Sequence, residues 1–373
     1  MKIIHIIDSE GMYGAEVMLL NLAGEQKRSG HHPVIVSIRE KDEIDTPLED
    51  EARRRGLEAV TFRMVDGPNF LGAWDILRYA RHNSFDVMHA HGYKGDILFG
   101  FIPRYFRKIP LICTLHGWTS MTKLSKLHAY EVIDALSMRN IDAVCVVNKA
   151  ILSDRRLRHL KGRLHVIPNG IPSLVDPGTE LEGRLIEFCR QGFAIVTIGR
   201  LSKEKAHKHL IEAFSHFSRV FADGRLLIIG EGPERSALEE IVKNKGLTGK
   251  VMLPGYQEQA WRYLRFCQLF VLSSVTEGMP ITLLEALQTG VPVIATAVGG
   301  ISEVLRHGDL GCLAIPDDPA SLYVGMTEAR NNMTSAIDMA KRAKEIAATD
   351  YSSKRMAEEY GIVYDSVIDS YNI

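Results

Sequence analysis

Two carboxylates accompany a short expected helix in the last third of the chain, Glu277 in the loop before it and Glu285 within it. Glu277 lies three residues before Pro280, and Glu285 lies eight residues after Glu277. Pro280 fits the first helical position, and Gly290 fits the position just past the last one. The first turn of a helix presents N–H groups that bind anions, so a phosphate could sit near residues 281–283 between the two carboxylates. Carboxylates on either side could then bind hydroxyl groups, an arrangement that suits a nucleotide sugar.

Two cations follow the strand expected over residues 193–199. Arg200 comes directly after it, and Lys205 lies five residues farther on. Ligands bind at the carboxyl edge of an open parallel sheet, and both side chains would leave the sheet there. They could neutralise a diphosphate, Arg200 as a fork and Lys205 as a point charge. An exposed cationic loop is the alternative, but placement in the same sheet as Glu277 favours the binding role.

Three candidate histidines of the first half are His116, His89 and His91, in or beside expected strands. His116 follows the strand expected over residues 111–115, where an imidazole can contact a reacting centre or a sugar hydroxyl; a structural role is the alternative. His89 and His91 alternate on one strand face, which makes a metal site conceivable, but no further ligand cluster accompanies them. No Asp-x-Asp motif follows an expected strand. We therefore predict no metal site.

Glycine-rich turns follow several expected strands. Gly14 lies in the first of them, whose spacing is not the G-x-G-x-x-G of dinucleotide binding. Glu231 and Tyr256 each follow a later strand. Backbone groups in these turns could approach a ligand and line a nucleobase pocket. A plain strand-to-helix turn is the alternative for each.

Strand-like and helix-like runs alternate along the whole chain. Strands are expected over residues 3–8, 33–38, 59–62, 85–90, 111–115, 142–147, 164–167, 193–199, 226–230, 250–253, 269–273, 292–296 and 312–315. Such alternation implies parallel sheets with right-handed crossovers, and two sets of strands imply two Rossmann-like, doubly wound α/β domains. Pro172 and Gly178 interrupt the pattern between the sets. We expect an N-terminal domain over 1–170, a C-terminal domain over 171–350 and a terminal helix over 351–373.

The composition fits a soluble protein of two domains. The chain has 373 residues, of which 24% are charged and 46% hydrophobic, with a net charge of −1. No apolar run approaches the ~18 residues of a membrane span, and the first residues begin a strand rather than a signal peptide. The five cysteines have neither metal nor redox spacing, so we expect reduced thiols in a cytoplasmic protein.

With these residues together, the chain resembles the retaining glycosyltransferases of family four, which have the GT-B fold. The resemblance follows the chain order through Gly14-Ala15-Glu16, His116-Gly117, Ile167-Pro-Asn-Gly170, Gly199-Arg200, Lys205, Gly230-Glu-Gly-Pro233, Glu277-x7-Glu285 and Gly299-Gly300-x-x-Glu303. The Glu-x7-Glu block, continued through Gly300, is its most specific part. The chain departs from the family at Ala206, where a glycine usually follows the lysine.

The resemblance implies two domains that face a central cleft, and a role for each candidate residue. Arg200 and Lys205 would bind the donor diphosphate, Glu277 the transferred sugar and Glu285 the ribose. His116 would act with Arg200, Lys205 and Glu277 in catalysis. Further donor contacts are implied for Gly14, Glu231, Tyr256, Gly278, Met279, Leu283 and Leu284. No metal and no cofactor are implied beyond the nucleotide sugar, for which we expect UDP rather than GDP.

The expected reaction is transfer of a hexosyl unit to a glycan or polyprenyl-linked acceptor in cell-surface polysaccharide synthesis. A sugar-nucleotide 2-epimerase of the same fold and a non-catalytic sugar-nucleotide-binding protein are the alternatives. No nucleic acid partner is expected. Residues 97–130 hold no carboxylate but several cations and aromatics, among them Phe99, Arg107 and Trp118. This segment is the candidate for peripheral contact with the inner face of a membrane, a solvated face with core aromatics being the alternative.

Overall fold

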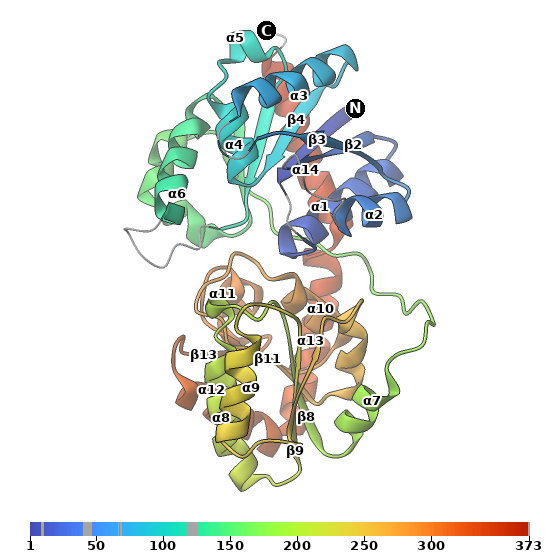
Figure 1. Ribbon diagram of the computed structural model, residues 1–373, viewed down its shortest axis with the longest axis vertical. Helices are drawn as coiled ribbons and strands as arrows, with labels where there is room; N and C mark the ends of the chain where they lie inside the picture. Colours follow the sequence, from blue (N-terminus) through green and yellow to red (C-terminus); the bar gives the residue numbers. More distant parts are fainter. Residues whose placement is uncertain (9–10, 40–46, 66, 68, 118–125, 372–373) are drawn as a thin grey trace. The chain divides into compact units, whose positions relative to one another are not determined.

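A computed structural model describes residues 1–8, 11–39, 47–65, 67, 69–117 and 126–371 of the chain (Figure 1). Two compact units make up the fold. Unit 1 comprises Met1–Pro172 together with Ser352–Ile373, and unit 2 comprises Ser173–Tyr351. Each unit is built on one parallel sheet, so the prediction of two Rossmann-like α/β domains is confirmed.

Unit 1 contains a seven-stranded sheet in the order β3-β2-β1-β4-β5-β6-β7, and every pairing is parallel. Its strands are β1 (Lys2–Asp8), β2 (His32–Arg39), β3 (Glu58–Arg63), β4 (Val87–His91), β5 (Leu111–Leu115), β6 (Ala143–Val146) and β7 (Leu164–Val166). The strand order reverses its direction between β1 and β4. In doubly wound sheets a ligand crevice opens at that switch point.

Helices connect these strands as the alternating pattern predicted. They are α1 (Gly14–Arg28), α2 (Pro47–Arg54), α3 (Phe70–His82), α4 (Tyr93–Gly100), α5 (Arg104–Arg107), α6 (Lys126–Ser137) and α14 (Ser353–Tyr371), with 3-10 turns at Met138–Asn140, Lys149–Ser153 and Arg155–Leu160. The helix α14, red in Figure 1, packs against α1 although the two lie at opposite ends of the sequence. The C-terminal segment therefore completes the first unit.

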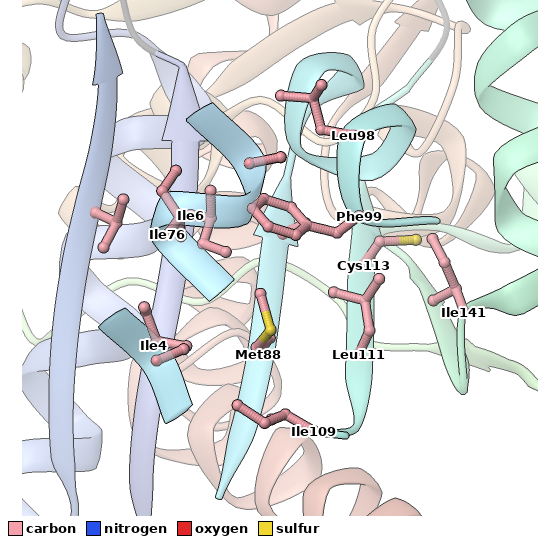
Figure 2. Close-up of a cluster of buried hydrophobic side chains, with 14 of the residues drawn as sticks. Ile4, Ile6, Ile76, Met88, Leu98, Phe99, Ile109, Leu111, Cys113 and Ile141 are labelled. Carbon is pink, nitrogen blue, oxygen red and sulfur yellow. The ribbon is translucent and has the colours of Figure 1, made fainter. Parts of the chain in front are cut away.

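The unit 1 sheet has one strongly apolar face. Ile4 and Ile6 of β1 and Met88 of β4 pack there against Phe99 of α4 and Ile76 of α3, as Figure 2 shows. Side chains alternate across a strand, so the residues between these positions point to the other face. Burial of the apolar face contributes about 25 cal/mol for each Å² removed from water.

Unit 2 contains a six-stranded parallel sheet in the order β10-β9-β8-β11-β12-β13. Its strands are β8 (Phe193–Ile198), β9 (Gly224–Ile229), β10 (Val251–Gly255), β11 (Leu269–Leu272), β12 (Val293–Thr296) and β13 (Cys312–Ala314). Its helices are α7 (Gly183–Arg190), α8 (His207–Val220), α9 (Arg235–Asn244), α10 (Ile281–Thr289), α11 (Ile301–Val304), α12 (Pro319–Asn331) and α13 (Met333–Asp350), with 3-10 turns at Lys203–Lys205, Ala260–Phe266 and Arg306–Gly308. Here the switch point lies between β8 and β11.

The segment that leaves unit 1 and the segment that re-enters it are joined by backbone contacts. Ile171 and Ser352 form a parallel bridge, and the Ser353 amide donates to the Ile171 carbonyl at 2.9 Å. A Cβ at Gly170 would lie 2.4 Å from the Ser352 carbonyl oxygen, so no side chain fits there. No helix within the described ranges is long and apolar enough to cross a membrane.

Candidate functional site

The candidate cations and carboxylates of unit 2 come from the two strands that flank its switch point. Arg200 and Lys205 follow β8, and Glu277 lies in the loop that follows β11. Since β8 and β11 are parallel neighbours, both loops leave the same edge of the sheet. This is the edge at which open α/β sheets bind ligands.

An ion pair joins the two loops. The Lys205 ammonium lies 2.6 Å from Glu277 Oε1, with side chains that are only 21% and 10% exposed. The Ser274 hydroxyl donates to the same carboxylate oxygen at 2.7 Å. Charge-assisted hydrogen bonds of this kind are short and hold both groups in a defined orientation. Ser274 was missed at the sequence level, although its place three residues before a loop glutamate resembles a capping-box spacing.

Backbone contacts also link the loops that carry Lys205 and Glu277. The Ser273 hydroxyl donates to the Lys205 carbonyl at 2.9 Å, and the Val275 amide donates to the Glu204 carbonyl at 2.8 Å. Lys205 and Glu277 therefore keep their separation without depending on their own side-chain contact alone.

Ala206 explains how the chain passes from the lysine into α8. Its φ is 48° and its ψ is 38°, which is the left-handed conformation that glycine adopts most readily. A residue with a Cβ costs roughly 1–2 kcal/mol there. Ala206 therefore adopts a backbone conformation that is strained for a residue with a Cβ.

Helix α10 begins beside Glu277, one residue later than the sequence predicted. Pro280 has φ −71° and ψ 126°, so it occupies the N-cap and not the first helical position. Its β-region ψ excludes it from the helix proper, while Gly290 ends the helix with φ 79° as predicted. The Leu283 amide donates to the Pro280 carbonyl at 3.2 Å. Leu284 lies beyond the first four N–H groups, which are those that lack intrahelical acceptors.

Glycine 299 allows two loops to meet behind Glu277. A Cβ at Gly299 would lie 1.8 Å from the Glu277 carbonyl oxygen, and the φ of 52° already favours glycine. The Gly300 amide donates to the Gly278 carbonyl at 2.8 Å. The loop after β12 thus supports the backbone that carries Gly278 and the buried Met279. This supporting role of the glycine pair was missed among the predicted site residues.

The turns after β9 and β10 lie beside the Arg200 turn. The Leu201 amide donates to the Glu231 carbonyl at 2.8 Å, and the Gly230 amide donates to the Gly255 carbonyl at 2.9 Å. The Glu231 carboxylate pairs with Arg235 at 2.6 Å. Tyr256 is 63% exposed at this edge.

Glu285 lies midway along α10, with its side chain partly buried. Burial raises the pKa of its carboxyl group to about 8. Within the described part of the chain, this group has no hydrogen-bonding partner. At neutral pH the Glu285 carboxyl group is therefore protonated until a ligand supplies a hydrogen-bonding partner.

The remaining predicted site residues, Gly14 and His116, lie in unit 1. Gly14 is the first residue of α1, and a Cβ there would meet no other atom within 4 Å. His116 follows β5, and burial lowers the pKa of its imidazole to about 4. Its Nε2 has no partner among the residues described, and its ring stacks on His91 with a centroid distance of 5.9 Å. A neutral imidazole is therefore held at the end of this strand.

A third histidine accompanies His89 and His91. His5 of β1 lies opposite His89 of β4 in the sheet register, and one ring nitrogen from each of the three lies within 4.8 Å of the others. The expectation that no further potential ligand accompanies the pair is wrong on this point. His5 is distant in sequence, and only the β1–β4 pairing brings it close.

The basic, aromatic segment 97–130 is less uniform than its composition predicted. Phe99 lies in the apolar core, and the buried Arg107 pairs with Asp142 at 2.5 Å. A charge count cannot distinguish a buried, paired arginine from a solvated one. Tyr105 and Phe106 are 79% and 56% exposed. Trp118 and Lys123 lie outside the described residues.

Comparison with known proteins adds two family matches. A model described as "Glycosyltransferase Family 4" matches residues 12–173, and one described as "Glycosyl transferases group 1" matches residues 190–346. The first region covers most of unit 1 and ends one residue beyond Pro172, and the second lies within unit 2.

Individual proteins resemble the chain over most of its length. N-acetyl-alpha-D-glucosaminyl L-malate synthase of Bacillus anthracis is 24% identical over 294 residues, or 78% of this chain and 77% of that protein. Alpha-monoglucosyldiacylglycerol synthase of Acholeplasma laidlawii is 24% identical over 318 residues, 79% of each. The crystal structure of Anabaena HepE in complex with UDP has a TM-score of 0.81 at 18% identity, covering 98% of this chain and 100% of that one. The last likeness is one of fold.

Proposed function

The chain is a glycosyltransferase of the GT-B fold that is similar to family 4, and from this premise we propose that it transfers a hexosyl unit from a UDP-sugar to a glycan or lipid-linked acceptor with retention of anomeric configuration. The observation that carries the proposal is the ion pair between Lys205 and Glu277, formed by loops at the carboxyl edge of β8 and β11. It brings a cation and a carboxylate together beside the start of α10.

In this proposal Lys205 and Arg200 stabilise the departing nucleotide. Cleavage of the donor develops negative charge on the β-phosphate and positive charge on the anomeric carbon. A cation held in place before the reaction lowers the barrier without further reorganisation, and the N-terminus of α10 acts in the same direction. Two such cations supply positive charge at the leaving group, and we expect activity in EDTA.

Glu277 is assigned to the hydroxyl groups of the transferred sugar. Its Oε1 is engaged by Lys205 and Ser274, which stabilises the carboxylate as an acceptor. A double displacement would need this group as a nucleophile against the anomeric carbon. We propose instead that the acceptor attacks on the face from which the nucleotide leaves. Detection of a sugar covalently attached to Glu277 by intact-protein mass spectrometry would contradict this mechanism.

The nature of the donor and acceptor is inferred from the relatives. A fold neighbour bound to UDP supports a UDP-sugar, and a relative named for synthesis of alpha-monoglucosyldiacylglycerol supports a lipid-linked acceptor. A panel of UDP- and GDP-sugars, scored for slow hydrolysis by the purified protein, tests the donor. We expect one UDP-sugar to be hydrolysed, with release of the α-anomer detected by NMR. Formation of an epimer without any acceptor would identify an epimerase instead.

Access to a lipid-linked acceptor suggests peripheral contact with a membrane surface in the cytoplasm. Tyr105 and Phe106 expose their rings on α5, and Phe101 just before that helix is 42% exposed. Such aromatic rings suit the headgroup level of a bilayer. Sedimentation with anionic liposomes at low salt tests this contact, and a Y105S/F106S double variant should remain in the supernatant. Equal sedimentation of both proteins would exclude this surface.

A further inference from the structure

A chain of hydrogen bonds runs along the face of the unit 1 sheet opposite to the apolar face shown in Figure 2. It begins with three histidines, His5 of β1 and His89 and His91 of β4, which are buried to 1% exposure or less. Ile4 and Ile6 flank His5 in sequence and point to the apolar side, as the alternation of a strand requires. A buried imidazole without partners is costly, by about 1–3 kcal/mol for each unpaired group.

The Gln26 side chain sets which group donates and which accepts along this chain of hydrogen bonds. Its Oε1 atom lies 2.7 Å from His5 Nε2 and can only accept, so His5 carries its proton on Nε2. His5 Nδ1 is then a lone pair, and His91 Nε2, 3.0 Å away, must donate to it. This leaves His91 Nδ1 as the unprotonated nitrogen, and that atom has no partner among the described residues.

A second branch starts from the same amide. Gln26 Nε2 donates to the Tyr364 hydroxyl at 3.2 Å, so the Tyr364 proton turns to His89 Nδ1 at 2.7 Å. His89 Nε2 then donates to the Thr114 hydroxyl at 2.8 Å, and that hydroxyl lies 2.8 Å from the Tyr360 hydroxyl. Helix α14 thus supplies two tyrosines that complete the network from the far end of the sequence.

These contacts favour a hydrogen-bonded network over a metal site. The three histidines could supply one ligand atom each to an ion. However, five of their six ring nitrogens already have a partner with complementary donor or acceptor character. A zinc ion would have to break these hydrogen bonds to gain three ligands.

The network ends at a residue of the candidate site. The His91 ring stacks on the His116 ring, with centroids 5.9 Å apart and an interplanar angle of 29°. Burial lowers the pKa values of His5, His91 and His116, so all three rings are neutral at neutral pH and stack without charge repulsion. Fixing the His91 ring through His5 therefore also restrains the plane of His116.

We propose that His91 is a positioning residue for His116, with Gln26 and His5 fixing the tautomer and orientation of the His91 ring. The role of His116 toward the sugar rests on the proposed function. The tautomers and ring positions of the network do not, so the two can be tested separately.

The test combines histidine NMR with kinetics on the full-length protein. In the wild type, long-range ¹⁵N–¹H spectra should show the Nε2–H tautomer for His5, His89 and His91. In the Q26L variant, which removes the acceptor of His5, this pattern should be lost and the His116 signals should shift. A geometric error at the reacting centre should lower kcat by about tenfold to a hundredfold with the donor KM little changed.

A matched control lies on the second branch. T114V removes the partner of His89 and Tyr360 and lowers stability to a similar degree, but it leaves the bonds from Gln26 through His5 to His91 intact. Its His91 tautomer and kcat should match the wild type. Unchanged His116 signals in both Q26L and H91F would overturn the proposal, as would stoichiometric Zn²⁺ binding to the purified protein that H5F abolishes. If H116A keeps full activity, the catalytic role of His116 fails, while the NMR results still decide the positioning by His91.

Discussion

The two sheets of this protein place their polar groups in opposite ways. In unit 2 the charged side chains leave the carboxyl edge of the sheet in loops, where Lys205 and Glu277 remain partly exposed and paired. In unit 1 the polar side chains His5, His89 and His91 lie on a face of the sheet that helices cover, and all three are buried. The edge of a sheet accommodates charge because solvent or a ligand can reach it. The buried face of a sheet disfavours unpaired charge, and most polar groups there need a matched donor or acceptor.

Both sheets reverse their strand order beside their first strand, and in unit 2 an ion pair joins the loops that follow the two strands at that point. The pair is held by backbone contacts from Val275 and by the Ser273 hydroxyl. In unit 1 the equivalent strands, β1 and β4, are joined by the hydrogen bond between His5 and His91. In the proposed function, unit 2 would supply electrostatic stabilisation and unit 1 a neutral imidazole.

Removal of the Lys205 cation should have the largest effect on catalysis. In K205A the leaving nucleotide loses its positioned charge, and we expect kcat to fall by at least about a hundredfold. Lys203 lies in the same loop and is exposed, so K203A is the matched control and should keep the wild-type rate. Steady-state donor hydrolysis measures both, and circular dichroism checks the fold. Similar rates in the two variants would show that the ion pair does not serve catalysis.

A Cβ at Gly299 should displace Glu277 without altering any charge. G299A places an atom against the Glu277 carbonyl. We therefore expect a lower kcat, and a loss of stability larger than the backbone strain alone would cause. Gly246 has a similar φ of 66° but open space around it, and G246A should cost only about 1 kcal/mol with unchanged kcat. Urea unfolding and kinetics distinguish the two. Equal behaviour would mean that the loop relaxes freely.

Acid should destabilise the neutral network of unit 1. Burial lowers the pKa of His5 from 6.5 to about 4, so between these values the unfolded chain binds a proton that the folded protein does not. The contribution of His5 is complete above pH 6.5 and is lost as the pH falls toward 4, by about 1.4 kcal/mol per pH unit. Urea unfolding as a function of pH measures the slope, which should be shallower in H5Q. An unchanged slope in H5Q would mean that His5 is charged in the folded state.

Glu285 of unit 2 should show a pH dependence of stability with the opposite sign. Its pKa is raised from 4.5 to about 8, so its burial lowers stability as the pH rises through this range. Hydroxyl groups that donate to the carboxylate favour its ionised form. Binding of UDP should therefore release up to one proton at pH 7, which calorimetry in buffers of different ionisation enthalpy detects. E285Q should abolish the release; an undiminished release would assign the proton to another group.

The sequence allowed the strands and the two sheets to be predicted because buried parallel strands are continuous apolar runs between turn residues. It also predicted that Lys205 and Glu277 leave the same edge of one sheet and that Gly290 follows the last residue of α10. Contacts between distant segments could not be predicted in the same way. His5 joins His89 only through strand register, and Arg107 is recognised as buried only once Asp142 is placed beside it. Ala206 shows a further limit, because its left-handed conformation is imposed by the loop and not by its own preference.

The return of helix α14 to unit 1 also has a consequence for synthesis of the protein on the ribosome. Gln26 and His89 emerge early, but Tyr364, which joins them, lies near the end of the chain. At a rate of about 5–20 residues per second, the interval between completion of Pro172 and of Tyr364 is about 10–40 s. During that time the polar side of the nascent sheet lacks its cover, while unit 2, whose chain is continuous, can fold. Chaperone binding to nascent chains should therefore persist until the last helix leaves the ribosome.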